Sequence, residues 1–201
     1  MEDPFALCPT PGVHQPDVKT AQYDAEAKSW VAPFIMAIIN TRVVHRSNHL
    51  AGGLYGSDFR YDETMMLGSG IWGRVKAVAI ARGLSLFDAA VEWPPTRYLV
   101  ELFGPKPGDG PSPEAQRAGF YDFIFFGRTA DGRRVDVRVT GDRDPGYGST
   151  SKMLGEAGAC LAFDLPKADH PGGFWTPATL MGGKLRSRLI EHAGLTFEVE
   201  R

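Results

Sequence analysis

Residues 144–154 read Asp-Pro-Gly-Tyr-Gly-Ser-Thr-Ser-Lys-Met-Leu, a glycine-rich turn that leads into apolar residues at helical spacing. Three hydroxyl side chains, those of Ser149, Thr150 and Ser151, stand where an oxygen can accept from the free N–H groups of a first helical turn. The stretch therefore predicts a capped helix over residues 150–163. Its predicted buried face carries the apolar residues that recur at helical intervals, which are Met153, Leu154, Ala157, Cys160 and Leu161.

A second turn of the same kind follows at residues 172–178, Gly-Gly-Phe-Trp-Thr-Pro-Ala. Thr176 is a candidate N-cap, and Pro177 occupies the first helical position, where its missing N–H costs nothing. A second helix is therefore predicted after this turn. Its predicted buried face consists of Met181, Leu185 and Leu189.

The clearest strand signals lie over residues 120–141. Residues 120–129 are aromatic and β-branched, Asp131-Gly132 is a tight hairpin turn, and residues 133–141 return as a second strand. Valines alternate with polar residues along the second strand, so one face of the sheet is predicted to be buried and the other polar. After a helix stop at Gly194, the same alternation over residues 195–199 predicts a closing strand.

The first half of the chain is predicted to be mainly helical. Residues 1–22 contain four prolines and are expected to be irregular. A helix is expected to begin after residue 24, or later with Pro33 in its first turn, and to run to about residue 48. A glycine-broken aromatic loop follows over residues 52–62. A long helix is expected over residues 63–92, with a break near Gly68.

Pro94-Pro95 ends this long helix in the prediction. A short helix follows at about residues 96–103, and a mobile loop follows over residues 104–119. The order of the elements suits an α+β fold, with an antiparallel sheet that is covered by helices on one face.

Composition limits the classes of function. The 201 residues are 43% hydrophobic, which is enough for a sizeable core, and the formal charge of -2 gives no electrostatic case for nucleic acid. No run of ~20 apolar residues exists, and no basic-then-apolar signal opens the chain. Cys8 and Cys160 lie far apart and form no metal framework, which favours a reduced, cytoplasmic compartment.

Two motifs suggest a cofactor or a metal, and each has a simpler explanation. Residues 68–73, Gly-Ser-Gly-Ile-Trp-Gly, match the spacing of a dinucleotide-binding loop, but no buried strand is predicted before them, so a helix break is the favoured interpretation. His45 and His49 have the i, i+4 spacing of two metal ligands, but a solvated or hydrogen-bonded pair is favoured. No cofactor-binding residue and no metal ligand is therefore assigned.

The candidate substrate-binding residues fall into two groups. Arg46, Ser47, Asn48 and Tyr61 form a polar and aromatic set that could line a substrate cleft; the alternative is a solvated Arg46 and a core Tyr61. Tyr147 and Thr150 lie at the glycine-rich helix entry. This entry could also cradle an anion with help from Lys152, although plain capping is favoured. No Ser/His/Asp order and no nucleophile elbow is present, so catalytic residues are left unassigned.

Segments spread over nearly the whole chain resemble the saccharopine dehydrogenase-like oxidoreductases. The resemblance is strongest to the branch that includes the trans-acting enoyl reductases of lipid and polyketide synthesis. The segments that carry it are Asp17-Val18 to Tyr23-Asp24, Trp30-Val31-Ala32-Pro33-Phe34, Ile39-Asn40-Thr41-Arg42-Val43-Val44, Arg46-Ser47-Asn48, Tyr55-Gly56, Phe59-Arg60-Tyr61-Asp62-Glu63, Gly108-Asp109-Gly110-Pro111-Ser112-Pro113, Asp144-Pro145-Gly146-Tyr147-Gly148 and Gly172-Gly173-Phe174-Trp175-Thr176-Pro177-Ala178.

The resemblance implies a division of labour. Such proteins are about twice this length and begin with a Rossmann domain that binds NADP or NAD, and this chain resembles only their second half. The implied organisation is an irregular segment, 1–22, and a substrate-binding and dimerisation domain, 23–201, from a truncated reductase that holds no cofactor itself.

The resemblance also implies partners. These are an acyl or lipid-like substrate and either a second copy of the chain or a separate Rossmann-domain protein. The alternative is a non-catalytic lipid-binding or dimerisation module, in which residues 63–92 make a peripheral membrane contact.

Overall fold

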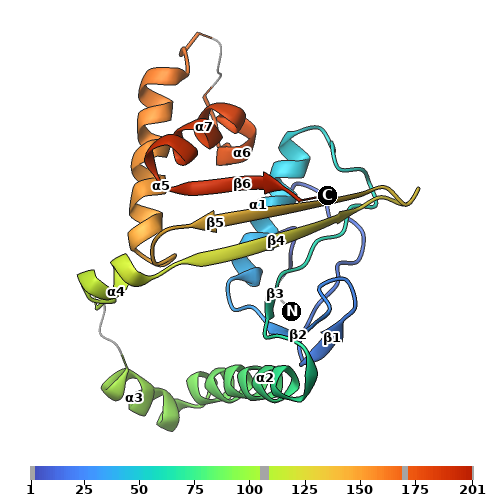
Figure 1. Ribbon diagram of the computed structural model, residues 1–201, viewed down its shortest axis with the longest axis vertical. Helices are drawn as coiled ribbons and strands as arrows, with labels where there is room; N and C mark the ends of the chain where they lie inside the picture. The colour runs from blue at the N-terminus through green and yellow to red at the C-terminus, as the bar shows by residue number, and fades with distance from the viewer. Residues whose placement is uncertain (1–2, 105–108, 169–171, 201) are drawn as a thin grey trace. The chain divides into compact units, whose positions relative to one another are not determined.

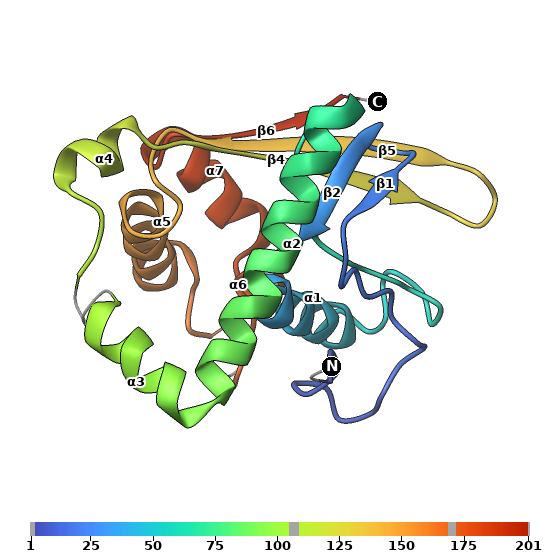
Figure 2. The same cartoon turned by 90° about the horizontal axis from the view of Figure 1, so that it is seen from below.

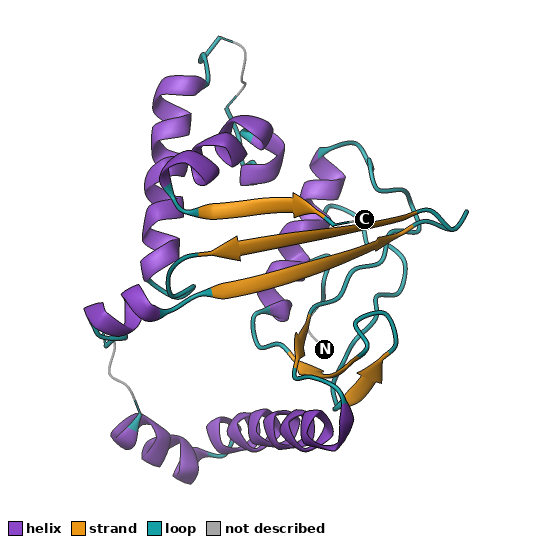
Figure 3. Cartoon of the chain, viewed as in Figure 1, coloured by secondary structure: helices purple, strands orange, loops and turns teal. Residues whose placement is uncertain are grey.

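The computed structural model describes residues 3–104, 109–168 and 172–200. The chain forms two compact units, residues 1–107 and residues 108–201 (Figure 1), and each unit is described by itself. The residues predicted to form one domain, 23–201, are divided between these units. The fold is α+β, as predicted, but it contains two three-stranded antiparallel sheets, where the prediction had one (Figure 3).

The sheet of the first unit was missed in the prediction. Its strands are β1 (Gln22–Asp24), β2 (Ser29–Pro33) and β3 (Thr64–Met66), with β2 in the centre. The helix predicted from residue 24 is therefore wrong at its start. The reason is a local turn, because the Asp24 carboxylate accepts hydrogen bonds from the N–H groups of Glu26 and Ala27 and reverses the chain.

The helices of the first unit are α1 (Ala37–Leu50), α2 (Gly70–Glu92) and α3 (Pro94–Phe103). The break predicted near Gly68 is confirmed, because the segment before it is strand β3 and the segment after it is helix α2. Helix α3 begins at Pro94, two residues earlier than expected. Residues 52–62 form a loop, as predicted.

Helix α2 packs along strand β2 through small residues (Figure 2). Gly73, Ala77 and Ala81 are its buried residues and recur every four positions. A Cβ atom on Gly73 would lie 2.1 Å from the Gly68 carbonyl oxygen, so only glycine allows the first turn of the helix to approach the preceding loop this closely. Several bulky apolar residues of α2 are exposed instead; Ile71, Trp72 and Leu86 are 66%, 73% and 71% exposed.

The second unit contains the predicted hairpin, β4 (Tyr121–Arg128) and β5 (Arg134–Gly141), and the predicted closing strand, β6 (Leu195–Val199). Helix α4 (Pro113–Ala118) lies inside the predicted loop 104–119, of which residues 105–108 are outside the described residues. Between β5 and β6 the chain forms α5 (Gly148–Ala159), the π-helical turn η1 (Cys160–Asp164), α6 (Pro177–Leu180) and α7 (Gly182–His192).

The register gives the sheet one apolar and one polar face. Phe123, Val139 and Phe197 are paired across the three strands, and side chains two residues away along each strand point to the same side. The next row towards the hairpin turn is Phe125, Val137 and Val199. On the opposite face, Arg138 pairs across the strands with Asp122 and also contacts Glu200. Asp136 pairs across the strands with Arg128 and along its own strand with Arg134.

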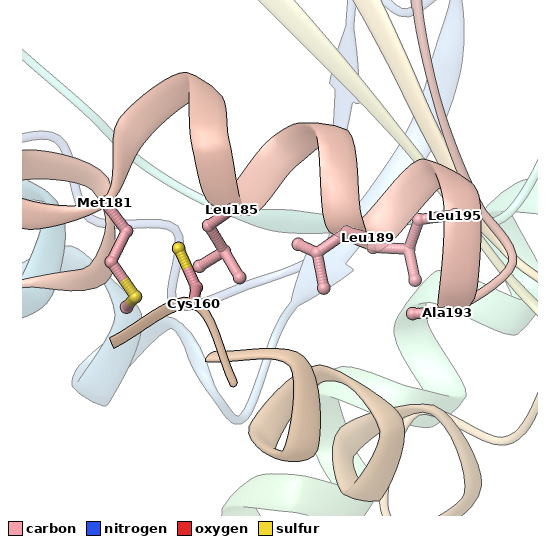
Figure 4. Packing of buried hydrophobic residues seen from close by; sticks show 6 residues of the cluster. All are labelled: Cys160, Met181, Leu185, Leu189, Ala193 and Leu195. Carbon is pink, nitrogen blue, oxygen red and sulfur yellow. The ribbon is translucent and has the colours of Figure 1, made fainter. Parts of the chain in front are cut away.

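Helices α5 and α7 pack at the end of the sheet where β4 and β6 begin (Figure 1). Leu185 and Leu189 project from α7 into a cluster with Cys160 (Figure 4), as the periodicity predicted. Two residues of the buried face predicted for the helix over residues 150–163 are not in this core, because Leu154 is 72% exposed and Leu161 is 48% exposed. The full cluster is Cys160, Met181, Leu185, Leu189, Ala193 and Leu195.

The ends of these helices follow the sequence signals in part. Thr176 and Thr179 form a reciprocal capping box at the start of α6, with Pro177 at the first position, as predicted. Gly194 ends α7 with a φ of 71°. The π-helical turn is held by α7, because Arg188 binds the carboxylates of Asp164 and Glu156.

Candidate functional site

A cavity of about 400 Å³ in the first unit lies at the C-terminal end of helix α1. Three segments line it: the N-terminal segment, the last turns of α1, and the glycine-rich loop that follows. Positions 45, 48 and 49 share one side of the helix because they are three or four residues apart, and all three line the cavity together with Gly52 of the following loop. The aromatic, thiol and polar side chains of the lining include those of Phe5, Cys8, His45, Asn48, His49 and Phe59.

His45 is the most unusual side chain of this cavity. Its ring lies between Phe5 and Phe59, at centroid distances of 4.5 Å and 5.7 Å, and the residue is only 3% exposed. Its Nε2 atom is buried and makes no hydrogen bond within the part of the chain that the structure describes. Burial lowers the pKa of His45 from its ordinary value, so the imidazole is neutral at pH 7.

Gln15 holds the N-terminal segment against the rest of the unit. Its side-chain amide donates hydrogen bonds to the carbonyl oxygens of Val13 and Phe59, at 2.9 Å and 3.1 Å. Its side-chain oxygen accepts from the N–H of Tyr61 at 3.0 Å. Because Gln15 is 5% exposed, these three bonds satisfy a buried amide and tie residues 13–15 to residues 59–61.

Asn48 shapes the loop on the other side of the cavity. Its Oδ1 atom accepts from the N–H of Tyr55 at 2.9 Å, and its carbonyl oxygen accepts from the N–H of Gly53 at 2.8 Å. These bonds close the chain after α1 into a compact loop. Asn48 thus lines the cavity and also positions the loop.

Tyr61 belongs to a separate polar group. Its hydroxyl donates to Glu63 Oε1 at 2.8 Å, and the amide of Asn40 donates to Glu63 Oε2 at 2.8 Å. Burial raises the pKa of Tyr61 well above its ordinary range, and the negative charge of Glu63 raises it further. Tyr61 can therefore donate a hydrogen bond but is a poor candidate for a phenolate base.

The other predicted residues of the first unit lie away from the cavity lining. The Ser47 hydroxyl is buried and donates to the carbonyl oxygen of Val43 at 2.7 Å. Arg46 lies close enough to Cys8 for its charge to oppose the rise in thiol pKa that burial causes. Of the four candidates in this unit, only Asn48 lines the cavity.

Tyr147 and Thr150 belong to the second unit, at the start of α5. The Tyr147 ring packs against Gly110, and its hydroxyl lies 3.5 Å from the Asp109 carbonyl oxygen. Thr150 donates its hydroxyl to the carbonyl oxygen of Pro145 at 2.6 Å. Both side chains hold the glycine-rich turn in shape.

The cap of α5 is Asp144, which corrects the prediction of a hydroxyl cap. Its carboxylate accepts from the N–H groups of Tyr147 and Gly148, at 2.7 Å and 3.3 Å, and these bonds lower its pKa. The protein's own carboxylate thus stands where a bound anion would stand. Lys152 pairs with Asp142, so capping is the better interpretation of this turn, as favoured above.

The buried Ser149 hydroxyl, a predicted cap, is hydrogen-bonded to the Tyr121 hydroxyl at 2.9 Å. Tyr121 lies over Gly141 on the neighbouring strand, where an added Cβ atom would stand 2.2 Å from the tyrosine ring. The hydroxyl of Ser149 therefore joins helix α5 to the sheet and takes no part in capping.

Neither motif that suggested a cofactor or a metal gains support. Strand β3 does precede residues 68–73, and α2 begins at Gly70, but β2 and β3 are antiparallel, whereas a dinucleotide-binding loop needs a parallel βαβ unit. His45 is buried and His49 is exposed, and no group of three or more metal-ligating side chains gathers in residues 3–104, 109–168 and 172–200.

None of the helices in these ranges is long and apolar enough to cross a membrane.

Sequence reasoning missed most of the cavity. His45 was interpreted as one of a solvated or hydrogen-bonded pair, whereas it is buried with Nε2 unbonded among the described residues, and Phe5 and Cys8 lie in the segment predicted to be irregular. Phe59 was placed correctly in an aromatic loop, which is the one local signal that pointed here. The contacts through Gln15 join residues 46 positions apart, and no periodic pattern reveals them.

Comparison with curated proteins places these observations in a family context. A protein of Mycobacterium tuberculosis strain H37Rv named "Putative trans-acting enoyl reductase" is 38% identical over 213 aligned positions, which cover 100% of this chain and 51% of that protein. A trans-acting enoyl reductase of Mycobacterium bovis BCG is 38% identical over 168 positions, 80% of this chain and 39% of its own length. A trans-acting enoyl reductase of Mycobacterium ulcerans is 37% identical over 164 positions, with the same shares.

No family model matches the chain, and no solved structure matches it significantly. The chain spans about half the length of the curated relatives that it matches. At 38% identity, these relatives support kinship of the chain with the trans-acting enoyl reductases.

Proposed function

We propose that this chain is the substrate-binding portion of an NAD(P)-dependent enoyl reductase of the saccharopine dehydrogenase-like type, acting on acyl groups in lipid or polyketide synthesis. The observation that carries the proposal is the 38% identity along the whole chain to a protein of about twice its length that is named for this activity. In this proposal the chain corresponds to the second half of such an enzyme and works in the cytoplasm.

The redox cofactor, NADP or NAD, is assigned to residues outside this chain. The described residues contain two antiparallel sheets and no parallel βαβ unit, so they do not fit a dinucleotide. We therefore derive no step through the nicotinamide. The task left to this chain is to bind an unsaturated acyl thioester, to orient it and to exclude water from it.

The test is calorimetric titration of the chain with two ligands in separate experiments. Crotonyl-pantetheine, a short α,β-unsaturated thioester, is expected to bind saturably, whereas NADPH is expected to bind weakly or not at all. Absence of thioester binding would overturn the proposal. A Kd for NADPH below ~1 µM would overturn the division of labour between this chain and the rest of the enzyme.

A non-catalytic lipid-binding module is the second candidate, and the surface of helix α2 favours it. Trp72 and Leu86 are 73% and 71% exposed on a helix that also carries Arg74 and Lys76, and such residues suit a peripheral membrane contact. Co-sedimentation with anionic liposomes separates the candidates. Pelleting of the chain that is lost in Trp72→Ser would favour the membrane contact, and no lipid-dependent pelleting would remove it.

A dimerisation role has its own support in the second unit. The apolar face of the sheet is open to solvent near the hairpin end, where the residues Phe125, Val135 and Val199 are 42%, 45% and 72% exposed. This surface suits a second copy of the chain or a separate Rossmann-domain protein. A clean monomer by light scattering at tens of micromolar would count against self-association.

A further inference from the structure

The buried Nε2 atom of His45 lacks a partner among the described residues, and this calls for a physical reason. A buried polar atom without a hydrogen bond destabilises the folded state, so native proteins keep few of them, and a catalytic role or a bound water or ion is among the usual reasons. The ring lies beside a cavity of about 400 Å³, so an unsatisfied polar group and a space for a ligand occur together.

The chemistry of the lining points to an uncharged ligand. The described lining residues include aromatic rings, backbone at several glycines and the polar side chains of Asn48 and Ser57, but no lysine, arginine or carboxylate. Burial keeps His45 neutral, and the second histidine of the lining, His49, is exposed to solvent, so the wall carries no permanent charge to balance a phosphate or a carboxylate. The volume lies at the small end of the range for small-molecule sites, which suits an acyl group better than a dinucleotide.

Phe5 is placed to act as a movable wall. Its ring packs against His45 at 4.5 Å and against Gly12, where an added Cβ atom would stand 2.5 Å from the ring. It also lines both the main cavity and a neighbouring cavity of about 220 Å³. A rotation of the Phe5 ring towards the smaller cavity would therefore open the main cavity towards His45.

We propose that this cavity binds the acyl part of a thioester substrate, with the Nε2–H group of His45 donating to the carbonyl oxygen after Phe5 has turned aside. The choice of ligand rests on the proposed function, whereas the position of the site rests on the cavity and on His45. A donor at this oxygen polarises the carbonyl group, which is where negative charge develops when an enoyl thioester is reduced. Phe59 supplies an apolar wall for the acyl chain.

The two cysteines provide a direct assay of the cavity. Cys8 lines it, whereas Cys160 is 0% exposed and bonds to Asp164, so alkylation of the folded chain reports on Cys8. Labelling with N-ethylmaleimide is followed by mass spectrometry, with saturating butyryl-pantetheine as an unreactive thioester. We expect labelling of Cys8 to slow at least ~10-fold. The thioether S-butyl-pantetheine, which lacks the thioester carbonyl, is expected to protect ~10-fold less well.

Variants of His45 test the hydrogen bond. His45→Phe keeps an aromatic ring between Phe5 and Phe59 but removes Nε2, so the affinity for butyryl-pantetheine by calorimetry is expected to fall ~10-fold. His45→Gln keeps a donor and is expected to restore part of the affinity. His192→Phe, in the second unit, is the matched control and is expected to bind as the parent chain does.

The outcomes separate this inference from the proposed function. Thioester binding without protection of Cys8, or unchanged binding by a folded His45→Phe variant, would overturn the cavity assignment and leave the proposed function standing. Thioester binding that protects Cys8 and weakens in His45→Phe would support both. Absence of any thioester binding would overturn both.

Discussion

Helices α2 and α7 bury opposite kinds of residue. Helix α7 inserts Leu185 and Leu189 into a cluster of bulky side chains, whereas α2 buries Gly73, Ala77 and Ala81 and leaves several of its bulky residues exposed. A helix that must approach a backbone closely needs small residues there, and this requirement overrides the usual preference for burying large ones. Hydrophobic periodicity thus locates the packed face of α7 but points away from the packed face of α2.

The largest effect is expected from truncating a residue of the bulky cluster. Leu189→Ala removes buried methyl groups and leaves a cavity between α7 and its neighbours, so the free energy of unfolding should fall by ~2–4 kcal/mol. Urea denaturation followed by circular dichroism measures it. Leu86→Ala in α2, where the side chain is 71% exposed, should change stability by less than ~0.5 kcal/mol. Equal losses in the two variants would contradict the contrast drawn above.

Two glycines of helix α2 sharpen the comparison. Gly73→Ala places a methyl group 2.1 Å from the Gly68 carbonyl oxygen and should destabilise the first unit by ~1–3 kcal/mol. Gly83 lies in the same helix with nothing within 4 Å of an added Cβ atom, so Gly83→Ala should stabilise by ~0.5–1 kcal/mol. Thermal unfolding of both variants gives the two signs. The same sign for both would show that α2 is not held by close approach at Gly73.

A smaller loss is expected at the contact between helix α5 and the sheet. Tyr121→Phe removes the hydrogen bond to the buried Ser149 hydroxyl and should lower the free energy of unfolding by ~1 kcal/mol. Tyr147→Phe is the control, because that hydroxyl is solvent-accessible and only 3.5 Å from its acceptor. It should be close to neutral in the same denaturation experiment.

The smallest effect is a pH dependence from His45. Burial lowers the pKa of His45 in the folded chain. When the pH falls below the ordinary pKa of about 6.5, the unfolded chain therefore binds a proton at His45 that the folded chain does not bind. The contribution of His45 to stability is therefore complete above that pH and is lost as the pH falls through the lowered pKa. The slope should be a fraction of the one-proton limit of ~1.4 kcal/mol per pH unit.

Comparison with His45→Phe isolates this contribution. The variant should show a flatter dependence of unfolding free energy between pH 7 and pH 5, because the ring that titrates has been removed. Identical slopes in the parent chain and the variant would exclude His45 as the source.

The same contrast explains how much of the fold the sequence predicts. The β4–β5 hairpin, β6 and the faces of α7 follow from alternation, turn residues and large apolar side chains, and these were predicted correctly. Residues 22–33 were not, because a short apolar run is compatible with a strand or a helix, and the Asp24 turn decides between them. The cap at α5 was misassigned because Asp144 lies four residues before the helix begins.

The candidate site was predictable only in its helical part. Asn48 was found because it lies among polar residues on a predicted helix. Phe5 and Cys8 reach the cavity through tertiary contacts, such as the packing of Phe5 on His45, which leave no trace in local spacing.

The pairing of β5 with β6 has a consequence for the synthesis of the chain. Thr140 and Thr196, whose hydroxyl groups meet at 2.7 Å, are separated by 56 positions, whereas β4 and β5 are joined by a short turn. A nascent chain can thus close the hairpin soon after residue 141 leaves the ribosome, but one edge of β5 stays open until residue 199 has emerged. Helices α5, α6 and α7 are made in that interval, so a chaperone that shields an open strand would be needed most while they are being translated.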